Sequence, residues 1–130
     1  MQVINKIMMF AIVVNDMPKA KEFYADKLGM KVAKDYRQDD DHWWVSVAPT
    51  DSGTSITLTT FKENRQPGTM ILWLSTSDIV TAHKDLSGKS VKPDDIKDDL
   101  YGPGSGVKWF SLNDPDGNLV HIAEEKVPNW

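Results

Sequence analysis

Cysteine is absent from the 130 residues of this chain. Its absence excludes a disulfide framework, zinc sites built on thiolates and a cysteine nucleophile. No apolar run approaches the roughly 20 residues that a membrane-spanning helix needs, and the first residues lack the pattern of a signal peptide. We therefore expect a cytoplasmic protein without a membrane partner.

Arginine is scarce as well: Arg37 and Arg65 are the only two among 15 basic residues, and the formal net charge is −4. Several lysines surround the first predicted helix, namely Lys19, Lys21, Lys27, Lys31 and Lys34. Because the chain is acidic overall and no aromatic residues alternate with these lysines, the pattern is typical of a solvated helix face. We expect no nucleic-acid partner.

What the chain does contain fits one globular domain over 1–130, with 40% hydrophobic and 26% charged residues. Its first half predicts a strand over about 5–14 and then a helix that Asp16 caps and Gly29 ends. Three strands are expected next, at 31–36, 42–48 and 55–61, with a turn at 49–53 joining the last two. The polar segment 62–68 is the one plausible linker.

The second half repeats this pattern. We expect a strand over 70–76, a helix capped by Ser77 or Asp78 and closed by Gly88, and an extended piece beginning at Val91. A glycine-rich acidic loop over 93–106 then leads into strands at 107–112 and 119–124, which the turn 114–118 joins.

Matched landmarks support an internal duplication. Asp16 and Asp78 are separated by 62 positions, whereas the two helix-closing glycines are separated by 59. Two βαβββ modules, spanning 1–64 and 69–127, account for the chain and predict an α+β fold. Neither module can bury its sheet face alone, so we expect the two to pack together.

Two motifs carry a family resemblance. The strand ending at 14–17 is followed by Ala20, Phe23-Tyr24 and Leu28-Gly29, and the closing turn Asp114-Pro115-Asp116-Gly117-Asn118 precedes an apolar strand ending in Glu124. This pattern resembles the vicinal oxygen chelate superfamily, which includes glyoxalase I, extradiol dioxygenases, fosfomycin-modifying enzymes and bleomycin-resistance proteins. The resemblance implies two βαβββ modules that form a curved mixed sheet around a cleft, with the helices on the outer face.

The same resemblance implies four cleft-facing positions where metal-dependent members place ligands. They fall on Met9, Thr57, Ile71 and His121. A thioether is too soft for the cations of this family, an uncharged hydroxyl is too weak, and isoleucine has no donor atom. We therefore expect no metal and no other cofactor.

Tryptophan is the remaining signal in the expected cleft. Strand alternation places Trp73 on the face of Ile71, and Trp109 lies where the glycine-rich loop enters its strand. One of Trp43 and Trp44 faces the cleft, and the sequence leaves open which one. The candidate ligand-binding residues are therefore Met9, Trp43, Trp44, Thr57, Ile71, Trp73, Trp109 and His121.

His121 has three interpretations at this stage: a former ligand position, a polar contact or general base in the cleft, and a core histidine with satisfied hydrogen bonds. The leading functional hypothesis is a metal-free homodimer that sequesters a hydrophobic or aromatic molecule, with antibiotic resistance as one such role. The alternatives are a glyoxalase- or dioxygenase-type metalloenzyme, and a metal-free isomerase or lyase that uses His121 as its base.

Overall fold

The computed structural model describes residues 3–49 and 53–129, which form two compact units divided between Pro67 and Gly68. The division falls within the predicted linker at 62–68. Residues 50–52 of the predicted turn lie outside the described residues. None of the helices in the described ranges is both long and apolar enough to cross a membrane.

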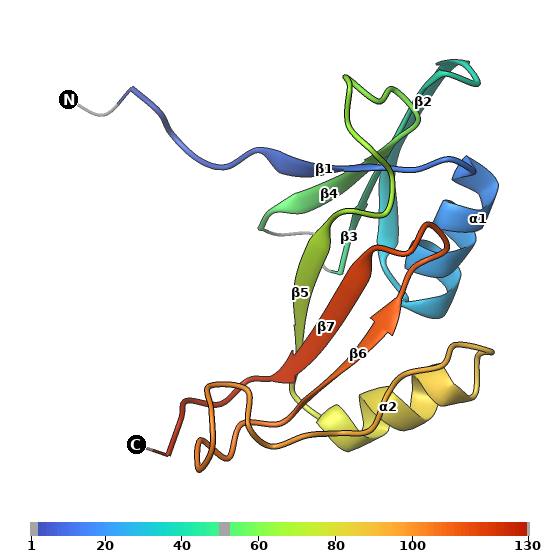
Figure 1. Ribbon diagram of the computed structural model, residues 1–130. Helices are drawn as coiled ribbons and strands as arrows, with labels where there is room; N and C mark the ends of the chain where they lie inside the picture. Colours follow the sequence, from blue (N-terminus) through green and yellow to red (C-terminus); the bar gives the residue numbers. More distant parts are fainter. Residues whose placement is uncertain (1–2, 50–52, 130) are drawn as a thin grey trace. The chain divides into compact units, whose positions relative to one another are not determined.

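The first unit is a four-stranded mixed sheet with one helical segment. It contains β1 (Met9–Val13), α1 (Met17–Lys21), its π-helical continuation η1 (Glu22–Lys27), β2 (Lys31–Asp39), β3 (His42–Ala48) and β4 (Ser55–Thr59). The strand order is β1-β4-β3-β2, with β1 parallel to β4 and the other neighbours antiparallel. Figure 1 shows α1 alongside this sheet.

Local chemistry explains where this helical segment begins. Asp16 has an extended backbone and accepts a hydrogen bond from Lys19 N at 3.1 Å, and Pro18 occupies the first turn, where its missing N–H costs nothing. The buried residues of this core come from both elements. The helical segment contributes Met17, Ala20, Phe23 and Tyr24, and the sheet contributes Ile12, Val45, Val47 and Leu58. The core of the first unit therefore lies between the helix and one face of the sheet.

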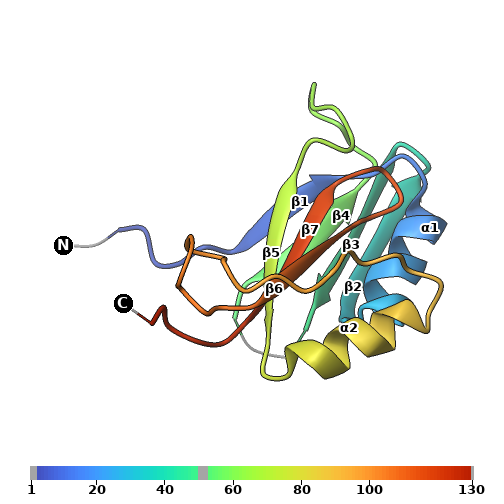
Figure 2. The ribbon, with the colours of Figure 1, turned by 60° about the horizontal axis from the view of Figure 1, so that its bottom comes forward.

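The second unit follows the same plan with a three-stranded sheet. It contains β5 (Ile71–Thr76), α2 (Ile79–Ser87), β6 (Trp109–Asn113) and β7 (Leu119–Glu124). The strand order is β5-β7-β6, with β5 parallel to β7 and β6 antiparallel to β7. Figure 2 shows α2 lying along this sheet. The core residues are Ile79, Leu86, Phe110, Leu112, Val120 and Ile122.

The predicted α+β class is confirmed, and each unit contains a mixed sheet, but one predicted strand differs. The segment from Val91 is not a regular strand. It bonds to β6 at separate points, with Asp94 N donating to Ser111 O at 2.9 Å and Lys97 exchanging backbone bonds with Trp109. Pro93 supplies no N–H for a ladder, so the outer position of this sheet holds an irregular segment.

The closing turn of the second unit is tied to the start of β5. Asp114 and Asn118 are buried, and the Asp114 carboxylate accepts from Asn118 N at 2.8 Å and Asn118 Nδ2 at 2.7 Å. Asn118 Oδ1 in turn accepts from Met70 N at 2.9 Å. The turn predicted from 114–118 therefore joins β6 to β7 and also anchors the chain entering β5.

Candidate functional site

The sheet face opposite α2 carries an aromatic cluster from three neighbouring strands. In the register, Trp73 of β5 is opposite His121 of β7, which is opposite Ser111 of β6. The Trp73 and His121 rings lie 4.1 Å apart between centroids, and Trp109 lies 5.9 Å from Trp73 and 5.3 Å from His121. Trp73 is 51% exposed whereas His121 is 9% exposed, so the cluster presents an open indole above a buried imidazole.

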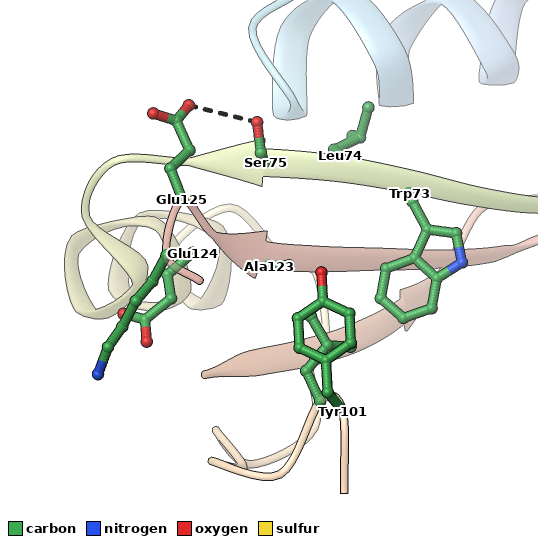
Figure 3. Close-up of a pocket in the computed structure, with 9 residues that line it drawn as sticks. Trp73, Leu74, Ser75, Tyr101, Ala123, Glu124 and Glu125 are labelled. Atoms are coloured by element: carbon green, nitrogen blue, oxygen red, sulfur yellow. Dashed lines mark hydrogen bonds between the residues drawn. The ribbon is translucent and has the colours of Figure 1, made fainter. Parts of the chain in front are cut away.

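Next to this cluster lies a cavity of about 590 Å³. Figure 3 shows the rings of Trp73 and Tyr101 projecting into the same region, one from β5 and the other from the glycine-rich loop. Ser75 Oγ donates to Glu125 Oε1 at 3.3 Å on the strand side. The cavity is lined by Trp73, Leu74, Ser75, Leu100, Tyr101, Ala123, Glu124, Glu125 and Lys126. Such a mixture of aromatic walls and a few polar groups is typical of small-molecule sites.

Two residues of the acidic loop hold Trp109 in place. Its Nε1 donates to Asp99 Oδ1 at 3.1 Å, and Lys97 Nζ lies 4.2 Å from the centroid of its ring. Lys97 is itself paired with Asp94 at 2.9 Å. Because both the edge and a face of the indole have partners, the ring orientation is set before any ligand arrives.

His121 has a hydrogen-bond partner on β6. Ser111 Oγ lies 2.6 Å from His121 Nδ1. Burial and the nearby Lys97 ammonium lower the pKa of His121 below its ordinary value, with Asp94 acting in the opposite direction. The imidazole is therefore neutral at neutral pH, and the hydroxyl fixes its orientation.

This lowered pKa makes stability depend on pH. The unfolded chain binds a proton on this histidine near pH 6.5, whereas the folded chain binds it only at lower pH. Neutral His121 therefore makes its full contribution to the free energy of unfolding above pH 6.5, and this contribution is lost as the pH falls below that value. We expect the free energy of unfolding of the wild type to drop more steeply than that of His121→Gln between about pH 7 and about pH 5. Urea unfolding in a pH series checks this, and parallel profiles would contradict it.

The first unit has its own cavity of about 570 Å³ on the sheet face opposite α1. Met9 of β1, Thr57 of β4 and Trp44 of β3 line it, and the Thr57 hydroxyl donates to the Met9 sulfur. Trp44 also lies near the ring of Phe61, with 6.1 Å between centroids. Three of the predicted site residues therefore share one face in this unit.

Trp43 lies on the other face of the same sheet. Its Nε1 donates to Asp35 Oδ1 at 2.7 Å, and the Arg37 guanidinium lies 4.2 Å from the ring centroid. Hydrogen bonds from Lys21 and Trp43 hold the pKa of Asp35 below its ordinary value. The structure thus assigns Trp44 to the cavity and Trp43 to a charged cluster beside α1.

The four positions that the family resemblance marks for metal ligands do not fit a divalent cation. In the first unit, Thr57 and Met9 offer a hydroxyl and a thioether that bond to each other. In the second unit, Ile71 lies on the same sheet face as His121 and is 61% exposed, but its hydrocarbon side chain has no donor atom. Among the described residues, no group of three histidine, aspartate or glutamate side chains could hold an ion. Zinc and harder cations need several such donors converging on one point.

Several contributing residues were not predicted. Ser111 was within reach of sequence reasoning, because it alternates with Trp109 on a predicted strand that pairs with the strand of His121. Lys97, Asp99 and Tyr101 lie in the irregular segment and loop, where no periodicity indicates which side chains turn toward the sheet.

Comparisons with known proteins agree with this fold. The model of the Glyoxalase/Bleomycin resistance protein/Dioxygenase superfamily matches residues 5–122. TnmS3, an antibiotic binding protein from Streptomyces sp. CB03234, is 28% identical with a TM-score of 0.81, and the match covers 97% of this chain and 100% of that one. A superfamily member from Sphaerobacter thermophilus DSM 20745 is also 28% identical with a TM-score of 0.81, covering 95% of this chain and 100% of that one.

A sequence relative from Shewanella frigidimarina (strain NCIMB 400) is 33% identical over an alignment of 119 residues, and the match covers 75% of this chain and 88% of the relative. Because the family model matches residues 5–122, the chain belongs to the Glyoxalase/Bleomycin resistance protein/Dioxygenase superfamily.

Proposed function

We propose that this protein binds and sequesters an aromatic small molecule, without a metal ion and without chemical conversion. The observation that carries the proposal is the aromatic cluster of Trp73, Trp109 and His121, which presents an open indole beside a cavity of about 590 Å³. A planar ligand stacked there would gain about 0.5–1.5 kcal/mol per aromatic pair beyond the burial of its apolar area.

Preorganisation supports binding at this cluster. Trp109 is held by Asp99 and Lys97, and His121 is held by Ser111. A ligand that meets rings already fixed in orientation loses less conformational entropy on binding. The neutral imidazole adds a polar contact that does not repel a cationic or neutral ligand.

The donor chemistry at the four metal-ligand positions supports the metal-free part of the proposal. Only His121 among them is a good ligand, and one imidazole without supporting donors does not hold a divalent cation. Stoichiometric nickel, zinc, manganese or iron in carefully purified protein would contradict this part and would favour a metalloenzyme.

The ligand class draws support from the structural relative TnmS3, which is described as an antibiotic binding protein. We propose that an aromatic antibiotic or a similar natural product is the ligand here. Titration of intrinsic tryptophan fluorescence with a broad panel of such compounds tests the idea. Saturable quenching by at least one compound is expected, and an unchanged emission with every member would refute it.

A homodimer is part of the proposal. The segment before and within β1 exposes large apolar side chains, namely Val3, Ile4, Ile7, Met8 and Phe10. Contiguous exposed apolar surface of this kind commonly marks an interface. We expect light scattering to give twice the chain mass of 14.6 kDa at micromolar concentration. The change Ile7→Lys should shift the protein toward monomer, and a wild-type monomer at all concentrations would contradict the assembly.

One observation favours a second function, a metal-free isomerase or lyase. Ser111 orients His121, and the lowered pKa keeps the imidazole unprotonated and able to accept a proton. For a compound identified in the panel, product analysis distinguishes the two functions. Turnover that disappears in His121→Ala while binding persists would establish catalysis. If the compound is chemically unaltered after long incubation, the result supports sequestration.

A further inference from the structure

Asp94 lies in the irregular segment beside β6 and uses its two carboxylate oxygens for two different partners. Oδ1 accepts a hydrogen bond from Ser111 N at 2.6 Å, and Oδ2 accepts one from Lys97 Nζ at 2.9 Å. Burial raises the pKa of Asp94, but these two hydrogen bonds outweigh it and hold the pKa below its ordinary value. The carboxylate is therefore charged at neutral pH and holds both donors at once.

The first partner leads to His121. Asp94 N also donates to Ser111 O at 2.9 Å, so one residue holds both backbone groups of Ser111. Because these groups point away from β7, Ser111 and His121 form a non-hydrogen-bonded pair of the antiparallel ladder, in which opposite side chains lie closest. Ser111 Oγ accordingly lies 2.6 Å from His121 Nδ1. Asp94 thus sets the position of the strand residue that orients the imidazole.

The second partner leads to Trp109. The Lys97 ammonium lies 4.2 Å from the centroid of the indole, and Asp94 is its partner in the ion pair. Lys97 and Trp109 also exchange backbone hydrogen bonds, at 2.8 and 2.9 Å, so the lysine side chain starts close to the ring that its ammonium covers. Both chains of contacts therefore begin at the carboxylate of Asp94.

Asp94 is itself held from α2. Its backbone oxygen accepts a hydrogen bond from His83 Nε2 at 2.8 Å. The His83 ring meets the buried Phe110 ring edge-on, with 4.9 Å between centroids. A residue fixed in this way from both the helix and β6 gives rigid support, which a binding site needs to keep its rings in one orientation.

We infer that Asp94 is a positioning residue of the aromatic cluster, because one carboxylate fixes Lys97 over the Trp109 ring and Ser111 beside His121. The inference rests on the proposed function, since these rings belong to the proposed binding site. Without the carboxylate, Lys97 loses the anion that holds it over the indole, and a ligand must then order the Trp109 ring on binding. The ion pair is partly exposed, so the affinity for naphthamide, a neutral planar aromatic compound, should fall about twofold to fivefold in Asp94→Asn.

Heteronuclear NMR of the ligand-free protein tests the positioning. Because Lys97 Nζ lies over the indole, the ring current of Trp109 should move the neighbouring methylene protons of Lys97 upfield. Asp94→Asn keeps an oxygen that accepts from Ser111 N but offers Lys97 no anion. In this variant the Lys97 signals should return toward those of an exposed lysine, while the Ser111 amide signal changes little. Asp94→Ala removes both partners, and both sets of signals should move.

Asp85→Asn is the matched control, because Asp85 lies on α2, is about as exposed as Asp94 and pairs with Lys89 at 3.0 Å. It should leave the Lys97 signals and the affinity for naphthamide unaltered. If Asp94 acts on the indole through Lys97, the double variant Asp94→Asn with Lys97→Met should bind naphthamide no more weakly than Lys97→Met alone.

Lys97 signals that stay upfield in Asp94→Asn, or losses of affinity that add in the double variant, would overturn the inference. An equal loss in Asp85→Asn would also overturn it, because a general effect of charge or stability would then explain the result. If neither naphthamide nor any compound of the aromatic panel shifts the indole signals of Trp73 and Trp109, the proposed function fails. The ligand-free spectra then still decide whether Asp94 positions the rings.

Discussion

Replacing Trp73 with alanine is expected to weaken the binding of naphthamide, a neutral planar aromatic probe, about tenfold or more, and replacing Trp109 should act in the same direction. The Trp73 indole is half exposed and lies 4.1 Å from the His121 ring and 5.9 Å from the Trp109 ring, so it forms the outer surface of the cluster. Its removal deletes both a stacking face and apolar contact area. Isothermal calorimetry on the neutral probe measures the loss without a contribution from charge.

Trp43→Ala is the matched control for this loss. Trp43 is the same residue type, but it lies on the helix side of the first sheet and bonds to Asp35. Its replacement should leave the affinity for naphthamide within about twofold of the wild type. A similar loss in all three variants would show that the effect comes from stability rather than stacking, and an unaltered affinity in Trp73→Ala would refute the stacking account.

Gly68→Ala should lower the free energy of unfolding by about 3 kcal/mol or more. Gly68 has a φ of +84°, which is strained for residues with a side chain, and a Cβ built there would lie 2.3 Å from the backbone oxygen of Asp116. Asp116 belongs to the turn that Asp114 and Asn118 hold rigidly. The turn therefore cannot move away without breaking its own hydrogen bonds.

Gly104 separates the two causes, because it has the same φ of +84° but no atom within 4 Å of a built Cβ. Gly104→Ala should cost only the backbone strain, about 1–2 kcal/mol. Denaturant unfolding of the two variants measures the difference. Equal losses in both would show that the close approach to Asp116 has no energetic weight.

The fold was largely predictable because its landmarks are local. Asp16 and Asp78 cap their helices through backbone amides three residues later, as their positions before apolar helical patterns indicated. The turn at 114–118 was recognisable from its composition alone. The hydrogen bond from Met70 N to Asn118 Oδ1 joins residues 48 positions apart, and no local sequence pattern predicts such a contact.

Strand alternation in the sequence did not predict two features of the sheets. The segment from Val91 continues the repeat in sequence, yet its ladder is interrupted by Pro93 and by the hydrogen bond that Ser111 N donates to Asp94 Oδ1 at 2.6 Å. In β2, a bulge between Val32 and Lys34 reverses the faces of the residues before it, and this bulge follows from the pairing with β3 rather than from residue types.

The site residues, too, were only partly predictable from the sequence. His121 and Trp73 follow from strand alternation and share a face in the structure. The choice between Trp43 and Trp44 was left open by the sequence, and the structure places Trp44 on the face of Ser46 and Trp43 on the face of two buried valines. The contacts of Lys97, Asp99 and Tyr101 depend on how a loop closes, and composition does not specify that path.

Binding to the metal-stripped protein tests the central claim most directly. The protein is treated with a strong chelator, its metal content is measured, and naphthamide is titrated while the indole signals of Trp73 and Trp109 are followed. Saturable shifts of both signals in protein free of metal, unaltered when zinc or manganese is added, are the predicted result. Shifts that appear only after a metal ion is restored would contradict it.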